Sequence, residues 1–378
     1  IDPRPGGGRR TRDICRRTRL RHLPRAAFLR GYWGSVHGRW CFKWWFYWLS
    51  VFCYIAKDTF QSWMRRNRKQ GGGTHRGGHH DHIPPARDGA GKRDLAVWDR
   101  LSDQPHQHAS RWAKRWIRLS DCPQLIAGMA VAAASAPKIR ARYKQLKREL
   151  HRRPVVFDGI GLCLRPWPDD PESQLAAVDE LGVRKILLRL HPWESDHDAE
   201  ETLARELHSR GCDLVFALPQ VRELVGDLGR WRSAVEEIGE RFTPYGRTFQ
   251  IGQAVNRSKW GIWTPSEYIS MFCTAAEVLR RIDGAQLTGP AVIDFEFQDT
   301  ANYANTRAAG LDFDVLSSLL YVDRRGAPES RQMGFDTIDK VLLLKAIADT
   351  GRNTAGRSWI TEVNWPLWEG PHLSLIHI

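Results

Sequence analysis

Glu362 is the residue of this chain whose place in the sequence most favours chemistry. It lies in the run S-W-I-T-E-V-N-W at residues 358–365, where apolar, aromatic and β-branched residues precede the carboxylate. Such a run predicts a buried strand with Glu362 at its carboxyl end. Catalytic groups of α/β barrels come from this end of the strands. Glu362 is therefore a candidate catalytic group, although a lone carboxylate at a strand end is often structural.

Other polar and aromatic residues follow the other predicted strands. They are Arg189, His191, Trp193 and Glu194 after the second strand, Gln253, Asn256 and Trp260 after the fourth, Asp294 and Glu296 in the fifth, Tyr321 after the sixth, and Asn364 and Trp365 after the seventh. Two acids can supply a nucleophile and a proton, indoles can stack on sugar faces, and amides can bind hydroxyls. The set predicts an oligosaccharide or polysaccharide substrate and requires no cofactor.

These residues also have structural interpretations. Glu296 alternates with Asp294 in D-F-E-F, so the two would share one strand face and could form an ion pair with Arg189. The tryptophans could pack in a core, and His191 could simply be a hydrogen-bonded histidine.

Strands alternate with helices from residue 154 onward. Strands are expected at 155–164, 184–190, 213–218, 248–253, 291–297, 315–322 and 358–363, and helices at 172–181, 199–209, 228–242, 265–282 and 334–349. This alternation predicts a parallel sheet. A doubly wound sheet is the alternative, but no glycine-rich phosphate loop follows the first strand. Seven units favour an α/β fold of the (β/α)8 TIM-barrel type, truncated after the seventh strand, with an open edge between the first and seventh strands.

On these motifs, residues 154–372 resemble the clan of retaining glycoside hydrolases with a (β/α)8 barrel. The resemblance implies that Glu362, in I-T-E-V-N-W, is the nucleophile. It also implies that Arg189 and Tyr321 orient Glu362, and that Asn256 binds a hydroxyl beside the reacting carbon. A glycoside hydrolase acting on a cell-envelope or exported glycan is the leading hypothesis.

One position departs from the clan. Its acid/base glutamate follows strand four, where this chain has G-Q-A-V-N and thus Ala254. Loss of a general acid costs a factor of about 10² to 10⁴. Glu296 is the expected replacement, and a catalytically inactive glycan-binding barrel is the alternative. A second alternative is a fragment of a bifunctional protein whose first domain resembles a sugar kinase.

Charge divides the chain in two. Residues 1–150 carry 32 Lys and Arg against 10 Asp and Glu, a net charge of +22, and the remaining 25 basic and 33 acidic residues give −8. The basic part suggests an anionic partner, here a membrane surface bound through residues 1–70 rather than specific nucleic acid. The aromatic run at 44–56, too short to span a bilayer, fits an interfacial segment, a remnant of a truncated domain or a misread frame.

The remaining expectations concern organisation and compartment. Residues 1–93 are expected to be mostly disordered or a domain remnant, 94–153 a basic helical linker, 154–372 the incomplete barrel, and 373–378 a sequencing-adapter remnant. Seven scattered cysteines favour a reducing compartment, so a cytoplasmic protein, peripheral at the inner membrane, is expected. His79, His80 and His82 are interpreted as a solvated loop rather than a metal site.

Overall fold

The computed structural model describes residues 97–99, 103–106, 111–150, 152, 159–166, 170–321 and 331–363. Several parts of the chain discussed above lie outside these ranges. They are the basic segment at 1–93 with its aromatic run and histidine tract, Asn364, Trp365 and the suspected adapter remnant. The described residues fall in one structural unit, Ala90–Ile378. The division into four segments drawn from the sequence stays a prediction.

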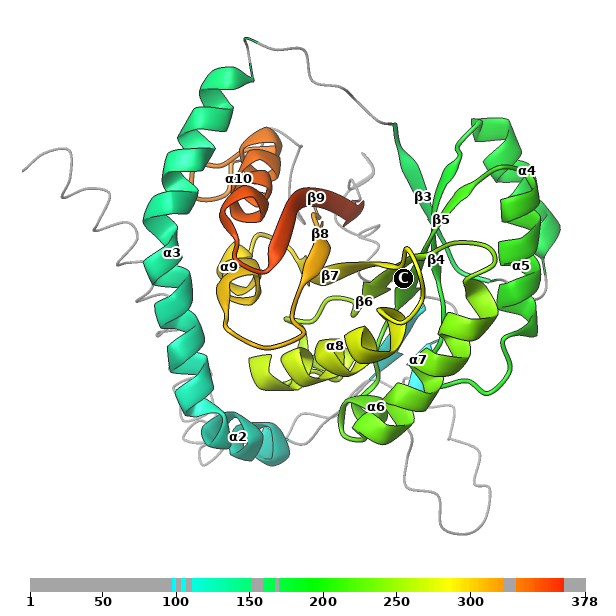
Figure 1. The fold of residues 1–378 in the computed structure, drawn as a ribbon, viewed down its shortest axis with the longest axis horizontal. Helices are drawn as coiled ribbons and strands as arrows, with labels where there is room; N and C mark the ends of the chain where they lie inside the picture. The colour runs from blue at the N-terminus through cyan, green and yellow to red at the C-terminus, as the bar shows by residue number, and fades with distance from the viewer. Residues whose placement is uncertain are drawn as a thin grey trace, which may run out of the picture. The chain divides into compact units, whose positions relative to one another are not determined.

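Seven parallel strands form the central sheet in the order in which they occur along the chain (Figure 1). They are β3 (Gly161–Leu164), β4 (Lys185–Arg189), β5 (Asp213–Leu218), β6 (Thr248–Ile251), β7 (Gln286–Ile293), β8 (Phe313–Leu319) and β9 (Thr354–Glu362). Each pairs in parallel with the next. The sheet curls into a partial barrel, which confirms the predicted α/β fold of a truncated TIM barrel.

Helices connect successive strands. They are α4 (Pro171–Leu181), α5 (Asp198–Ser209), α6 (Arg222–Val225), α7 (Leu228–Phe242), α8 (Pro265–Leu279), α9 (Phe297–Asn305) and α10 (Thr337–Thr350). Local sequence fixes several of their ends. Thr264 and Glu267 form a capping box at the start of α8, and Gly182 ends α4 in the left-handed conformation with φ 63°.

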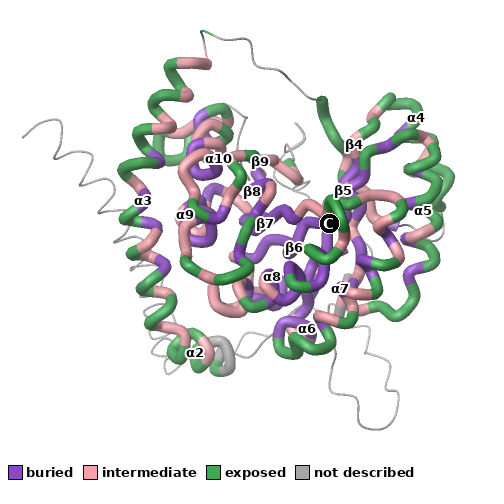
Figure 2. The backbone as a smooth tube through the Cα atoms, viewed as in Figure 1, coloured by how far each residue is buried: buried purple, intermediate pink, exposed green. Residues whose placement is uncertain are grey.

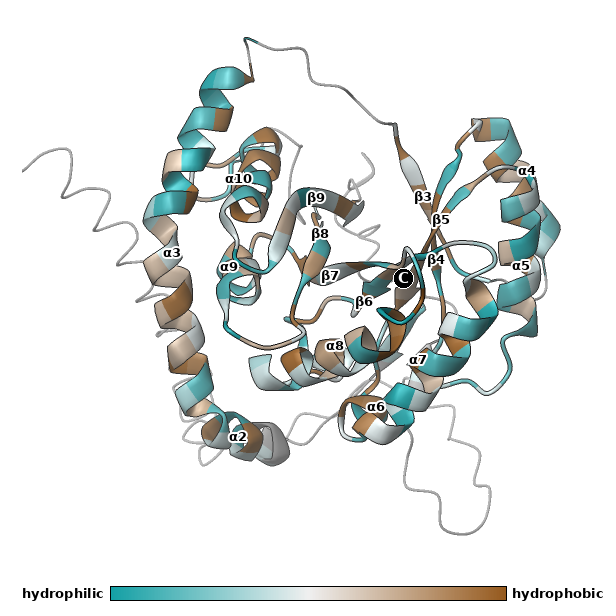
Figure 3. Cartoon of the chain, in the orientation of Figure 1, coloured by the Kyte–Doolittle hydropathy of each residue, from teal (hydrophilic) through white to brown (hydrophobic). Residues whose placement is uncertain are grey.

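The core lies between the sheet and these helices. Phe216 on β5 packs against Phe242 on α7, with ring centroids 5.3 Å apart, and Phe313 on β8 packs against Phe272 on α8 at 4.7 Å. Figure 2 shows burial concentrated along the central strands, and Figure 3 shows that the outer surfaces of α4 and α5 are mainly hydrophilic. This division is the two-sided burial expected of parallel strands covered by helices.

The first and last strands of the sheet, β3 and β9, are not paired through their backbones in the part of the chain that the structure describes. One side-chain contact joins them: the thiol of Cys163 donates to the carbonyl of Thr361, with sulfur and oxygen 3.1 Å apart. The expected open edge between the first and seventh strands is therefore present.

The fifth predicted strand needs correction. The sequence predicted a strand at 291–297, but β7 ends at Ile293 and α9 begins at Phe297. Glu296 is the residue that precedes α9, and Asp294 has φ 64°. The alternation in D-F-E-F therefore marks a turn into a helix that the sequence did not reveal.

Two elements before the barrel also differ from the expected helical linker. A hairpin of β1 (Val97–Asp99) and β2 (Gln104–His106) precedes α2 (Arg111–Ser120), and the long helix α3 (Cys122–Glu149) follows. The linker contains proline and glycine, and so does α3, which includes Gly128 and Pro137. The positions of these residues therefore could not predict where α3 begins and ends.

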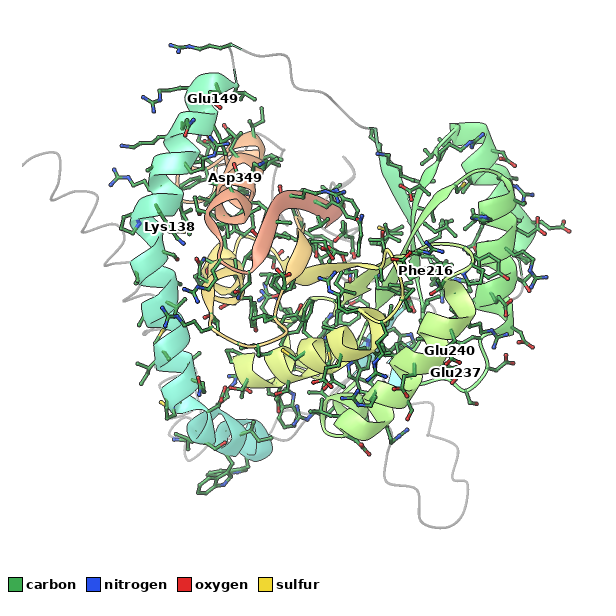
Figure 4. All side chains as sticks on the ribbon, in the orientation of Figure 1. Lys138, Glu149, Phe216, Glu237, Glu240 and Asp349 are labelled. Atoms are coloured by element: carbon green, nitrogen blue, oxygen red, sulfur yellow. The ribbon has the colours of Figure 1, made fainter. Side chains whose placement is uncertain are left out.

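Helix α3 runs alongside α9 and α10 (Figure 1). Its buried residues Gly128, Ala132, Ser135 and Ile139 recur at helical spacing and form one stripe. Lys138 donates to the backbone carbonyl of Thr350 at 2.7 Å, beside the α10 carboxylate Asp349, as the labels in Figure 4 help to follow. The linker is thus packed on the barrel as an extra outer helix.

Candidate active site

Glu362 receives hydrogen bonds from three other strand ends. Tyr321, just after β8, donates its hydroxyl to Oε1. Gln253, after β6, donates Nε2 to Oε2 at 2.6 Å, and Arg189, at the end of β4, donates NH2 to the same oxygen at 3.3 Å. The side chain of Glu362 remains 21% exposed. The structure therefore brings four of the residues singled out in the sequence into direct contact.

Gln253 is itself held in place. Its backbone N–H donates to Oε1 of Gln220 and its carbonyl accepts from Nε2 of Gln220, each at 3.0 Å. Gln250 on β6 donates Nε2 to Oε1 of Gln253 at 3.1 Å. All three glutamines are buried. These hydrogen bonds between buried amides fix the direction of the Gln253 donor.

Arg189 is shared between two carboxylates. Its NH1 donates to Oδ2 of Asp103 at 2.8 Å and to the Asp103 carbonyl at 3.1 Å, while NH2 contacts Glu362. Burial alone would lower the pKa of Arg189, but the charges of Asp103 and Glu362 raise it overall. Arg189 is therefore a fixed cation beside Glu362.

His191 lies between two buried acids. Its Nδ1 is 2.6 Å from Oε1 of Glu200 on α5, and its Nε2 is 2.8 Å from Oδ1 of Asp103. The other oxygen of Glu200 contacts His197. Burial would lower the pKa of His191, but hydrogen bonds to Asp103 and Glu200 raise it to about 9. His191 is thus the hydrogen-bonded histidine that the sequence allowed, and at neutral pH it carries a charge.

Three tryptophans meet at this end of the sheet. Trp98 on β1 lies with its ring centroid 4.2 Å from that of Trp193 and 5.8 Å from that of Trp260. Trp260 is 4% exposed, so it packs as core in this structure, whereas Trp193 is partly exposed. No sequence pattern predicted that Trp98 would join the two.

Ala254 occupies a buried position. Its φ is 47°, it is fully buried, and it packs with Trp260, Ala291 and Leu319 in a small apolar cluster. Trp98 and Tyr321 pack against the same cluster. A methyl group here fills space between side chains and provides no proton donor.

Glu296 and Asp294 form a second polar group. Arg257 donates NH1 to Oε1 of Glu296 at 2.6 Å and NH2 to Oδ2 of Asp294 at 2.5 Å. Asn256 donates Nδ2 to Oε2 of Glu296 at 2.7 Å and to the carbonyl of Ile293 at 3.0 Å. The suggested ion pair with Arg189 is wrong, because the guanidinium that these two acids bind belongs to Arg257. Glu296 and Glu362 are linked through one loop, since Gln253, Asn256 and Arg257 all follow β6.

Asp299 is a titratable residue near Glu296 that the sequence did not single out. It lies in the first turn of α9, and its backbone N–H donates to the Glu296 carbonyl at 3.0 Å. Burial, followed by the charge of Glu296, raises the pKa of Asp299 to about 7. A carboxyl group that titrates near neutrality is a candidate proton donor. Its position three residues after Glu296 becomes informative only once α9 is known to be a helix.

The remaining expectations concern metals and membranes. Among the described residues, no three His, Cys, Asp or Glu side chains gather in a way that could hold a metal ion. Within the same ranges, no helix is both long and apolar enough to cross a bilayer.

Comparison with known proteins found weak similarity to a solved structure. No family model matches this chain, and no curated protein matches it. Among solved structures, a GH30 endoxylanase from Clostridium papyrosolvens is similar, with 14% sequence identity over 43% of this chain and 49% of that chain, and a TM-score of 0.35. The match therefore spans about half the length of that protein. A likeness this weak assigns neither a family nor an activity.

Proposed function

We propose that this protein is a glycoside hydrolase-like enzyme that hydrolyses O-glycosidic bonds of a cell-envelope or exported glycan. The observation that carries the proposal is the convergence of Arg189, Gln253 and Tyr321 on Glu362. The four groups come from four strand ends of a parallel sheet, which is where α/β barrels place their catalytic residues.

Glu362 is proposed to act as the nucleophile. A nucleophilic carboxylate must be charged and must point at the anomeric carbon. Arg189 supplies a positive charge, and Tyr321 and Gln253 supply two directional donors. Donors that are already in place stabilise the carboxylate without reorganisation during the reaction.

Glu296 is proposed to deliver the proton in place of the group missing at Ala254. Its partners Asn256 and Arg257 lie on the loop after β6, and the same loop carries Gln253, which donates to Glu362. A retaining enzyme needs about 5 to 5.5 Å between its two carboxyl groups, and an inverting one about 6.5 to 9.5 Å. Asp299, one helical turn away, could resupply a proton to Glu296 from its raised pKa of about 7.

The other side chains singled out earlier are proposed to form the sugar-binding surface. They are Arg189, His191, Trp193, Gln253, Asn256, Trp260, Asp294, Tyr321, Asn364 and Trp365, of which the last two lie outside the described residues. Trp260 and Asn256 would have to move to bind sugar, because the first is buried and the second is bonded to Glu296.

The test is release of reducing ends from a panel of bacterial envelope polysaccharides. Wild type should hydrolyse at least one, Glu362→Gln should not, and Glu240→Gln, an exposed residue of α7 labelled in Figure 4, should match wild type. Binding without hydrolysis by wild type would instead favour the catalytically inactive barrel. That second candidate is favoured by one observation, the burial of Ala254 where the clan has its acid. The sugar kinase-like first domain concerns residues outside the described ranges.

An anionic membrane surface is proposed as a partner of residues 1–70, which lie outside the described ranges, and the described helix α2 adds a second surface suited to it. Trp112 and Trp116, four residues apart, are 66% and 69% exposed, and Leu119 on the same face is 58% exposed. Arg115 and Arg118 are also exposed. A short basic helix with exposed indoles suits the interface of an anionic bilayer, and would place the protein in the cytoplasm at the inner membrane.

Sedimentation with vesicles tests this partner. Wild type should bind phosphatidylglycerol vesicles and the Trp112→Ser/Trp116→Ser variant should bind less, while Ile338→Ser, a change at an exposed residue of α10, should have no effect. Equal binding by all three would contradict a role for α2.

A further inference from the structure

The β1–β2 hairpin lies over the carboxyl ends of the barrel strands. Trp98 packs against Trp193 and Trp260, and β2 lies against the 3-10 helix η1 (Ser258–Trp260) that follows β6. Lys259 in that helix donates to the side chain of Gln104. The hairpin therefore covers the surface on which a glycan would have to bind.

Asp103 is a hairpin residue whose side chain is buried in this surface. Its side chain is 4% exposed and its φ is 49°, in the left-handed region that an Asp tolerates better than most residues. Oδ2 accepts from Arg189 at 2.8 Å, and Oδ1 is 2.8 Å from Nε2 of His191. The side chains of Arg189 and His191 thus each bind one oxygen of the Asp103 carboxylate.

Trp98 completes the arrangement within the hairpin. Its Nε1 donates to Oδ1 of Asp103 at 3.0 Å, so a flat ring and a carboxylate are held together. The ring lies against Trp193, and the carboxylate lies against Arg189 and His191. A sugar ring that carries a carboxylate has the same two groups, namely a ring face that can pack against Trp193 and a carboxylate that can bind Arg189 and His191.

We propose that Arg189, His191 and Trp193 form a binding site for the carboxylate and ring of a hexuronic acid, and that the hairpin occupies this site until such a sugar displaces it. The proposal rests on the proposed function, because it names the class of sugar recognised beside Glu362. Arginine is suited to this role, because its planar guanidinium contacts carboxylates through several donors.

The charges near the site agree with an anionic ligand. With Asp103 in place, Arg189 and His191 face three acids, namely Asp103, Glu200 and Glu362. When the hairpin leaves, two cations and two acids remain, and the NH1 of Arg189 and the Nε2 of His191 lose the carboxylate that they bound. A ligand carboxylate that replaces Asp103 restores these charge-assisted hydrogen bonds, which a hydroxymethyl group cannot do, so a carboxylate is favoured.

Calorimetric titration of the full chain tests the site. Glucuronate and galacturonate are compared with their neutral counterparts glucose and galactose, on wild type and on Asp103→Asn, which keeps the shape of the side chain and removes its charge. The variant should bind one of the uronates about tenfold more tightly than wild type does, because the competing carboxylate is gone. Affinity for the neutral sugars should change much less. Unchanged or weaker uronate binding by a folded variant would overturn the proposal and make the hairpin a fixed part of the fold.

Hydrogen exchange on wild type covers the case in which Asp103→Asn does not fold. Added uronate should increase exchange at the amides of β1 and β2, and glucose should not. Unchanged or greater protection of β1 and β2 would overturn the proposal. Uronate binding without hydrolysis of any glycan would contradict the hydrolase and leave the site standing, whereas hydrolysis of a neutral glycan with no uronate binding would do the reverse.

Discussion

The surroundings of Glu362 and Glu296 differ in how they are built. Glu362 lies at the end of a strand, and its partners come from the ends of β4, β6 and β8. Glu296 lies in the turn before α9, and its partners, Asn256 and Arg257, are adjacent residues of one loop. Its side chain is 35% exposed, against 21% for Glu362.

This difference indicates different chemical roles. A carboxylate fixed from three strands cannot move without moving the sheet, which suits a nucleophile that must meet one carbon atom. A carboxylate on a turn, held by one loop, can adjust its position, which suits a proton donor that serves leaving groups of different size. Substitutions at the two carboxylates and at their partners should therefore have different effects.

The largest expected effect is on turnover. Glu362→Gln should lower kcat by about 10³-fold or more on every substrate, because the nucleophile is lost. Glu296→Gln should lower kcat by about 10² to 10⁴-fold on natural glycans. Its kcat/KM on a dinitrophenyl glycoside, whose leaving group needs no proton, should stay close to that of wild type, because only the second step then needs Glu296. Loss of this kcat/KM in Glu296→Gln as well would remove the distinction between the two carboxylates.

The arginines that hold the two acids should differ in their effect on stability. Both arginines bind two carboxylates, but the side chain of Arg189 is only 14% exposed, so Arg189→Gln should lower the free energy of unfolding by about 3 to 5 kcal/mol. Arg257 is 27% exposed at the rim, so Arg257→Gln should cost only about 1 kcal/mol. Urea unfolding of both variants measures this. An equal loss in the free energy of unfolding for both variants would show that the more buried Arg189 contributes no more to stability than Arg257.

The sheet could be predicted from the sequence, because the strands between its edges, β4 to β8, are buried on both faces and therefore appear as apolar runs. The edge strands β3 and β9 are only partly buried, so the expectation that Glu362 ends a buried strand is wrong. The contacts of Glu362 with Arg189 and Tyr321 were implied by the resemblance to the glycoside hydrolase clan, and the structure shows both. Asp103 could not be predicted, because its partner Arg189 lies 86 residues away and a three-residue strand leaves no periodic signal. Glu296 was placed on a strand because D-F-E-F alternates, whereas its conformation is decided by α9.

Asp299, close to Glu296, should make the free energy of unfolding depend on pH. Its pKa in the folded protein is raised from 3.8 to about 7. The folded protein therefore binds more protons than the unfolded chain between these values, and stability falls as the pH rises from about 4 to about 7. Asp299→Asn removes this cost and should stabilise the protein by up to about 4 kcal/mol at pH 8.

The gain from Asp299→Asn should shrink as the pH falls toward 4, because Asp299 is then protonated in both states. Urea unfolding at pH 5 and pH 8 gives the two values. Asp283→Asn, at an exposed residue before β7, is the matched control and should show no such difference. The same gain from Asp299→Asn at both pH values would contradict the raised pKa.

The smallest expected effect is at Tyr321. Tyr321→Phe removes one of the three donors to Glu362 and leaves Arg189 and Gln253 in place. We expect kcat to fall by about tenfold with KM little changed, as for one lost hydrogen bond to a charged group. Tyr245→Phe, which removes a hydroxyl that donates to Glu201 away from the site, is the control and should retain activity. A loss as large as that of Glu362→Gln would mean that Tyr321 takes part in the chemistry itself.

The central claim is that Glu362 forms a bond to the sugar, and covalent trapping tests it most directly. The full chain is incubated with 2-deoxy-2-fluoro glycosyl fluorides of the sugars that it hydrolyses, and the labelled peptide is identified by mass spectrometry. We predict one fluorosugar per chain, on Glu362, and none on Glu362→Gln. A label on Glu296, or hydrolysis that continues with inversion at the anomeric carbon and no label, would contradict the account.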